Sequence, residues 1–162
     1  MWIPSKDTGI DLLVSDRKNR RTASLQVKFG KDFLPAMTAD HQEPLRVCTW
    51  FTINRHKLRV SQADYWVFVL SGFKRHSPDF VIVPTADFKR RLGRIHGLTG
   101  KEMIQSYLWV TERSRCWETR DLEDGKDDER RIAAGVYENP VRELTKYLNE
   151  KGWNALAKKL GQ

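Results

Sequence analysis

Apolar residues in this chain gather in short runs that are separated by polar and charged segments. Such runs, rich in β-branched and aromatic residues and bounded by turn-forming residues, predict β-strands. Strands are expected over 9–14, 24–28, 63–70, 80–84, 107–110 and 115–119. The stretch 63–70 is apolar on both faces, so we expect it in the centre of a sheet.

Other segments place their apolar residues at helical spacing. Helices are expected over 50–59, 85–92, 140–152 and 153–160. Thr85 is positioned to cap the second of these helices, and Gly152 to end the third. The third has its apolar residues at 141–148, and we expect it to be amphipathic.

The length of 162 residues suits a single domain with a hydrophobic core, and 40% of the residues are hydrophobic. We expect a sheet-rich core over 1–120, a charged linker over 121–139 and C-terminal helices over 140–162. Strands that come first and helices that follow are typical of an α+β fold, here with an α/β sandwich-like arrangement.

Three polar side chains interrupt two of the predicted strands. Asp11 lies in the first, and Gln26 and Lys28 lie in the second. Residues two apart on a strand point to the same face, so Gln26 and Lys28 project together, about 6–7 Å apart. The polar segment 15–22 predicts a long basic turn and therefore an antiparallel hairpin, which brings Asp11 beside the other two residues.

Charged groups rarely enter apolar strands without a partner, because burying an unpaired charge is unfavourable. The Asp11 carboxylate and the Gln26 amide oxygen suit a hard cation such as Mg²⁺ or Mn²⁺. The Lys28 ammonium is suited to orient a water molecule or to stabilise charge on a phosphate. The alternative is an ordinary cross-strand ion pair between Asp11 and Lys28.

An acid on one strand followed by acid-x-Lys on the next resembles the PD-(D/E)XK nuclease superfamily, which has the restriction-endonuclease-like fold. Asp11 matches the first acid and Lys28 the lysine, while Gln26 stands where the family usually has Asp or Glu, as in its Gln-x-Lys variant. Pro4 is not adjacent to Asp11, so the proline half of the motif is not met. The resemblance covers roughly residues 1–90. It implies a central mixed sheet flanked by helices, with these three residues as the catalytic site.

A neutral amide binds a divalent cation less strongly than a carboxylate, so nearby acids would have to compensate for Gln26. The candidates by proximity in sequence are Asp7, Asp16 and Asp32. The resembling family also has a helix before its first strand, which this chain begins too late to hold. We therefore expect residues 141–148, or the partner copy in a homodimer, to cover that face of the sheet.

The chain carries 29 Lys and Arg against 21 Asp and Glu, and its net charge of +8 arises from the first 120 residues. A basic surface favours a polyanionic partner, and we expect duplex or branched DNA rather than RNA. Three basic clusters are expected to contact its phosphates: Arg17, Lys18, Arg20 and Arg21 in the turn, Lys74 and Arg75 in a loop, and Lys89, Arg90 and Arg91 on a helix.

Cys48 and Cys116 are isolated in the sequence, which argues against a zinc ribbon and suits a reducing compartment. The four histidines show no ligand spacing and are expected on the surface or in loops. No apolar run is long enough to span a membrane and no secretory signal is visible, so we expect a cytoplasmic protein without membrane contact.

These observations favour a metal-dependent DNA endonuclease. Asp11 and Gln26 would hold Mg²⁺, and Lys28 would assist the attack of water on a phosphodiester. The glutamine leaves open a second hypothesis, a DNA-binding protein that keeps the nuclease fold without catalysis. An RNA-processing nuclease of the same fold is the third.

Overall fold

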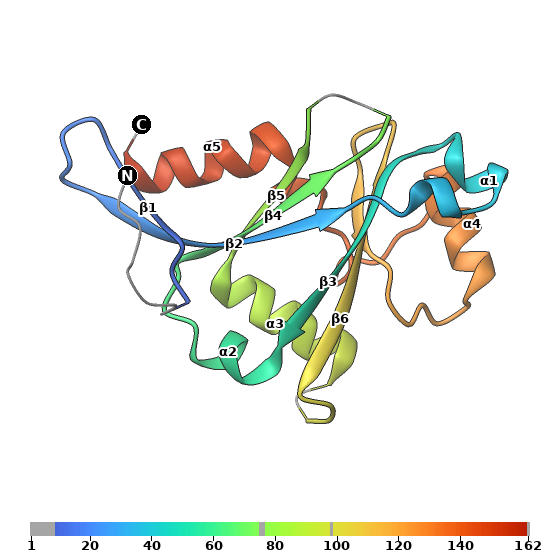
Figure 1. The fold of residues 1–162 in the computed structure, drawn as a ribbon, viewed down its shortest axis with the longest axis horizontal. Helices are drawn as coiled ribbons and strands as arrows, with labels where there is room; N and C mark the ends of the chain where they lie inside the picture. Colours follow the sequence, from blue (N-terminus) through green and yellow to red (C-terminus); the bar gives the residue numbers. More distant parts are fainter. Residues whose placement is uncertain (1–8, 75–76, 98, 162) are drawn as a thin grey trace.

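Two sheets form the framework of the described part of the chain, residues 9–74, 77–97 and 99–161 of a computed structural model (Figure 1). The first sheet contains, in spatial order, β1 (Leu12–Ser15), β2 (Thr22–Lys31), β4 (Tyr65–Ser71) and β5 (Asp79–Pro84). The second contains β3 (Leu45–Asn54), β6 (Met103–Thr111) and β7 (Cys116–Glu118). The helices are α1 (Ala39–Gln42), α2 (Arg55–Val60), α3 (Thr85–His96), α4 (Lys126–Ala134) and α5 (Asn149–Leu160), with 3₁₀ turns η1 (Leu34–Ala36) and η2 (Thr145–Tyr147).

The first sheet is mixed. β1 pairs with β2 and β4 with β5 in antiparallel fashion, whereas β2 and β4 run parallel. A parallel pair needs a long crossover, and here the chain between β2 and β4 passes through the second sheet as β3. β4 lies between β2 and β5, as its apolar sequence predicts. The α+β class and the antiparallel hairpin are therefore confirmed, while the second sheet was not predicted.

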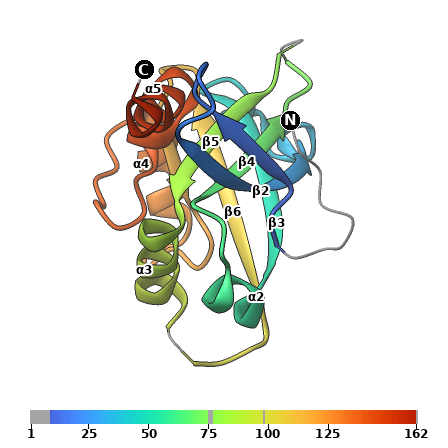
Figure 2. The same ribbon diagram turned by 90° about the vertical axis from the view of Figure 1, so that its left-hand side faces the viewer.

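Three apolar clusters hold these layers together. The main core lies between the sheets and includes Phe51 and Phe68. On its other face the first sheet packs against α5, where Leu25 and Leu156 belong to one cluster. The outer face of the second sheet is partly covered by η1 and α4, around Trp117. In Figure 1, α5 lies on the left and the α1/α4 pair on the right, and Figure 2 shows α5 and α3 along one side of the strands.

Two buried ion pairs link elements that are distant in sequence. Arg46 of β3 donates hydrogen bonds of 2.9 and 2.7 Å to Asp79 of β5, which joins the two sheets. Glu118 of β7 binds Arg142 at 3.0 Å, which fixes the segment before η2. Removing one partner of such a pair leaves an uncompensated buried charge, at a cost of about 3–5 kcal/mol.

The helix expected over 50–59 is wrong in its first half. Residues 50–54 belong to β3, where Phe51 and Ile53 are buried and Trp50 and Thr52 are exposed. This alternation has the period of a strand that is buried on one face. Only the second half of the segment is helical, as α2.

The charged segment 121–139 contains helix α4, so the expectation of a linker is wrong there. Ile132 on this helix is fully buried, and the buried Asp128 carboxylate accepts a hydrogen bond from the Asp124 backbone N–H at 3.3 Å. Three acidic residues in the first turn favour the helix through its dipole.

The helix expected over 140–152 is also wrong, because of residues 140–148 only the short η2 turn is helical. Arg91 on α3 explains part of this outcome. Its guanidinium donates hydrogen bonds to the backbone carbonyls of Pro140, Val141 and Glu143, which a helix would use internally. The C-terminal helix is instead α5, and Gly152 lies inside it rather than at its end.

α5 covers the sheet face that we expected residues 141–148 or a partner copy to cover. Leu12 and Val14 of β1 pack against the cluster that contains Leu156 and Leu160 of α5. Burying this face therefore needs no second chain. In the described segments, every helix is too short or too polar to traverse a lipid bilayer.

Candidate functional site

Asp11, Gln26 and Lys28 lie on one face of the first sheet. Leu25, which is part of the cluster under α5, occupies the opposite face, so Gln26 and Lys28 point away from α5. The backbone N–H of Asp11 donates to the Leu25 carbonyl at 2.8 Å, which extends the β1–β2 pairing by one residue and places Asp11 beside Gln26.

Asp11 pairs with Gln26 and not with Lys28. The Gln26 amide Nε2 donates to Asp11 Oδ2 at 2.5 Å, and the Val27 backbone N–H donates to the same oxygen at 2.6 Å. Lys28 Nζ lies 5.9 Å from the centroid of the Trp66 ring, on the neighbouring strand β4. The cross-strand ion pair considered above is therefore wrong for these residues.

The three side chains differ in their exposure to solvent. Gln26 is 8% exposed, whereas Asp11 and Lys28 are half-buried. Trp66, under the Lys28 ammonium, is fixed by a 3.3 Å hydrogen bond from its indole N–H to Ser61 Oγ, next to α2. The site is thus a polar patch with a rigid aromatic floor and an open side.

The donor set of this patch suits a cation that keeps most of its waters. Both hydrogen bonds to Asp11 fall on Oδ2, and Gln26 has an amide oxygen in addition to its donating nitrogen. Mg²⁺ is often bound through one or two carboxylates together with phosphate oxygens and water. Among the described residues, no three His, Cys, Asp or Glu side chains form a group that could hold a metal ion by themselves.

Of the acids expected to compensate for Gln26, the two that the structure describes are used elsewhere. Asp7 lies outside the described residues. Asp16 accepts a 2.7 Å hydrogen bond from the Arg20 backbone N–H in the hairpin turn. Asp32 is buried and accepts hydrogen bonds from the backbone of Leu34 and Cys48, so it stabilises the start of the second sheet.

The basic turn of the β1–β2 hairpin is free to meet a ligand. Arg17, Lys18 and Arg20 are exposed, and in the described structure their side chains make no hydrogen bond or ion pair. Arg21 lies beside Gly161 at the carboxyl end of α5, where the helix dipole favours a cation. Asp11 and the turn lie at opposite ends of β1, about 13 Å apart along the strand.

The other two basic clusters make contacts within the protein. Lys74 donates to the carbonyls of Gln42 and Leu45. Lys89 donates to the Arg59 carbonyl at 2.9 Å, and Arg90 forms an ion pair with Asp87. Arg91 holds the segment 140–143, as described above, and Arg75 lies outside the described residues. These contacts indicate a structural use for most of the two clusters.

A buried polar network around Glu118 was not predicted. The Glu118 side chain is bound by Arg142 at 3.0 Å and lies 3.3 Å from His96 Nε2. The His96 side chain is 8% exposed, so the expectation of a surface position is wrong for this histidine. Residues from α3, β7 and the segment before η2 meet here, and no spacing in the sequence indicates that they would.

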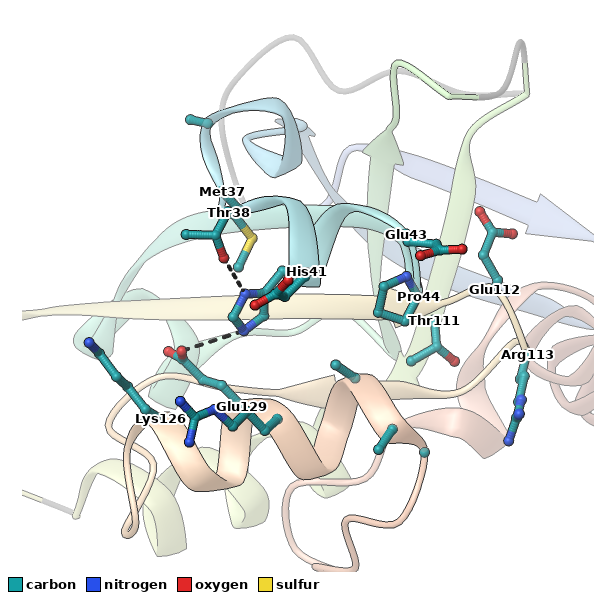
Figure 3. A pocket seen from close by; sticks show the side chains of 16 residues that line it. Met37, Thr38, His41, Glu43, Pro44, Thr111, Glu112, Arg113, Lys126 and Glu129 are labelled. Carbon is teal, nitrogen blue, oxygen red and sulfur yellow. Dashed lines mark hydrogen bonds and ion pairs between the residues drawn. The ribbon is translucent and has the colours of Figure 1, made fainter.

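A cavity of about 1020 Å³ lies between α1 and α4 (Figure 3). His41 points into it, with Nδ1 at 2.9 Å from Thr38 Oγ1 and Nε2 at 3.7 Å from Glu129 Oε2. Its lining contains both acidic and basic side chains, among them Glu43, Arg113 and Glu129. None of the predicted site residues that the structure describes lines this cavity.

Neither cysteine is suited to nucleophilic chemistry. Cys48 and Cys116 are both free and fully buried, in different parts of the second sheet. Burial raises the pKa of both thiols above its ordinary value, and the nearby Asp32 carboxylate adds to this effect at Cys48. Because the thiolate is the reactive form, we assign both residues to packing.

Comparisons of the chain with protein-family models, curated proteins and solved structures found no match. The function proposed below therefore depends on the residues of this chain alone.

Proposed function

We propose that this protein is a metal-dependent endonuclease that hydrolyses phosphodiester bonds, with DNA as the favoured substrate. One observation carries the proposal: Asp11, Gln26 and Lys28 lie together on one face of the β1–β2 hairpin, in a half-buried polar patch. An acid, an amide and an amine in this arrangement match the parts that metal-assisted hydrolysis requires. The net charge of +8 supports a polyanionic substrate.

Each side chain has a distinct role in this proposal. Asp11 would hold a divalent cation through its carboxylate, and Gln26 would add its amide oxygen. A bound Mg²⁺ would neutralise charge on the phosphate and lower the pKa of a bound water. Lys28 would orient the water whose oxygen attacks phosphorus. The new P–O bond would form as the bond to the leaving oxygen breaks; the attacking water would release one proton to solvent, and the leaving oxygen would take one up from solvent.

A specific contact favours a second candidate function, a nucleic-acid-binding protein without catalysis. Oδ2 of Asp11 already accepts two hydrogen bonds, and these satisfy much of a carboxylate without a metal. In this alternative the patch only stabilises the hairpin, while Arg17, Lys18 and Arg20 bind phosphates.

Plasmid cleavage in Mg²⁺ tests the first candidate. We expect Lys28→Ala to lower the cleavage rate about 100-fold or more, as is typical for removal of one electrostatic group from a catalytic site. The matched control is Lys158→Ala, which removes an exposed lysine from α5 and should leave the rate unchanged. Equal cleavage by wild type and Lys28→Ala would contradict the mechanism.

Calorimetry separates the two candidates. The endonuclease requires Mg²⁺ or Mn²⁺ binding that is lost in Asp11→Asn. Absence of metal binding by the wild type, together with salt-sensitive DNA binding, selects the second candidate. Competition between duplex DNA and structured RNA identifies the favoured substrate.

We expect the activity in the cytoplasm, because both cysteines are unpaired.

A further inference from the structure

The outer face of the second sheet is covered along only part of its length. Near β7, this face lies under η1 and α4, where Trp109 and Trp117 belong to a buried cluster. Farther along β3 and β6 the same face carries Trp50 and Met103, which are 49% and 46% exposed. In Figure 1 the lower parts of β3 and β6 extend below α1 and α4. A large indole in mid-strand is thus left in contact with solvent.

Trp50 has an aromatic partner across the strands. It lies opposite Tyr107 in the β3–β6 register, so both side chains project from the same face. Tyr107 is held on two sides: the Phe33 ring lies 5.9 Å from its centroid, and the Arg120 guanidinium lies 5.2 Å from it. Arg120 also donates to the Tyr107 hydroxyl at 3.3 Å, which keeps the guanidinium over the ring.

Polar side chains continue this surface toward α2. Thr52 lies opposite Gln105, on the same face as the aromatic pair, and both residues are exposed. Within the described residues, neither side chain makes a hydrogen bond. A hydroxyl and an amide therefore remain available to a ligand that is stacked on the indole.

Positive charge lies on both sides of the aromatic pair. Lys31 and Trp50 adjoin the antiparallel bridge between Asp32 and Thr49, and Lys31 is exposed. Arg120, whose side chain is 39% exposed, lies beside Tyr107. Asp121 offsets part of this charge through an ion pair with Arg120 at 3.2 Å. An apolar protein partner would not need these cations, whereas a phosphate backbone would be attracted by them.

We propose that this exposed part of the β3–β6 face, centred on Trp50 and bounded by Tyr107 and Arg120, binds unpaired nucleobases of single-stranded nucleic acid. Bases stack on aromatic rings and on guanidinium planes, and Thr52 and Gln105 are placed to hydrogen-bond their edges. The inference deepens the proposed nuclease function, on which it rests for the presence of a nucleic acid. It assigns to that activity a substrate with a single-stranded segment, such as a branch or a flap.

Equilibrium binding in EDTA tests the site apart from cleavage. The probes are a labelled single-stranded DNA of about twelve nucleotides, the RNA of the same sequence and the matching DNA duplex. We expect Trp50→Ala to weaken binding of the single strands about 5- to 150-fold, the range that corresponds to loss of one stacked base. Duplex binding should change by less than about twofold.

Two further variants identify the type of contact. Trp50→Phe keeps a ring and should retain most of the affinity, whereas Trp50→Leu keeps an apolar side chain without a ring and should behave like Trp50→Ala. The control is Trp153→Ala, which removes another exposed tryptophan, on α5, whose ring packs against Phe80 of β5. This variant should bind like the wild type.

The outcomes distinguish this site from the proposed catalysis. Unchanged single-strand binding by Trp50→Ala overturns the base-binding site, even where Mg²⁺-dependent cleavage by the wild type is observed. Wild-type affinity in Trp50→Leu overturns it too, because that result indicates a general apolar docking surface. If Trp50→Ala loses affinity for single strands and the wild type shows no cleavage, the result supports the base-binding site and rejects the nuclease.

Discussion

Gln26 is the residue on which the proposed chemistry depends most. Its amide N–H donates to Asp11 at 2.5 Å, and the residue is buried. A glutamate at this position would place a second carboxylate as close to the Asp11 carboxylate as the Gln26 amide is. Two carboxylates so close do not both ionise without a cation between them, so the pKa of one would rise above its ordinary value.

Gln26→Glu is therefore expected to make stability depend on the metal. In EDTA at neutral pH, its free energy of unfolding should be about 1.5–3 kcal/mol lower than that of the wild type. The reason is that a hydrogen bond to a charged group is replaced by repulsion between two carboxylates. Added Mg²⁺ should restore about 2.7 kcal/mol at a hundred times its Kd. Thermal unfolding with and without Mg²⁺ measures both effects.

Gln26→Met serves as the control, since it removes the same hydrogen bond without adding charge. It should lose stability without any gain from Mg²⁺ beyond that of the wild type. If the melting temperature of Gln26→Glu does not change when Mg²⁺ is added, the result would contradict a cation site beside Asp11.

At the scale of elements, α5 depends on a glycine to approach the sheet. A Cβ on Gly152 would lie 3.0 Å from the Ile82 side chain of β5 and would press on the Tyr147 carbonyl oxygen of η2. Both neighbours belong to elements that are themselves packed. The helix can therefore cover the sheet this closely only where the residue has no side chain.

Gly152→Ala should destabilise the protein although alanine is the better helix former. Helix propensity favours alanine by about 1 kcal/mol, but we expect the enforced shift of α5 to give a net loss of about 1–2 kcal/mol. Asn154→Ala, at an exposed position of the same helix, should be neutral or slightly stabilising. Urea unfolding of both variants tests this, and a stabilised Gly152→Ala would contradict the close packing of α5.

At the scale of the whole molecule, the positive charge is divided between two uses. Lys74, Lys89 and Arg91 bind backbone carbonyls and hold loops in place. The residues of the hairpin turn project into solvent. The net charge of +8 therefore overstates the surface that is available to a polyanion, and the turn supplies a concentrated part of that surface.

The triple variant Arg17→Ala, Lys18→Ala, Arg20→Ala tests this division through the salt dependence of duplex binding. Each phosphate contact contributes about 0.9 to the magnitude of the slope of log K against log salt concentration. Removing three contacts should therefore lower that magnitude by about two to three. The control combines Lys126→Ala, Lys151→Ala and Lys158→Ala, which removes the same charge from exposed positions on α4 and α5. Equal slopes in the two variants would assign the duplex to another surface.

Local patterns in the sequence determined several features without tertiary information. The polar turn between two apolar runs predicted the hairpin, and the spacing of two on a strand placed Gln26 and Lys28 on one face. The apolar run 63–70 predicted a central strand, which is β4. These features succeed because strand alternation and turn chemistry act between near neighbours.

Tertiary structure decided what depends on contacts between distant residues. Trp50 fits a helical or a strand pattern equally well, and its pairing with Tyr107 makes it part of β3. The carbonyls of 140–143 turn toward Arg91 instead of closing a helix, and His96 is buried by its approach to Glu118. Whether a basic residue binds a ligand or a carbonyl of its own chain is likewise decided by its surroundings in space, because the charge of a side chain does not specify its partner.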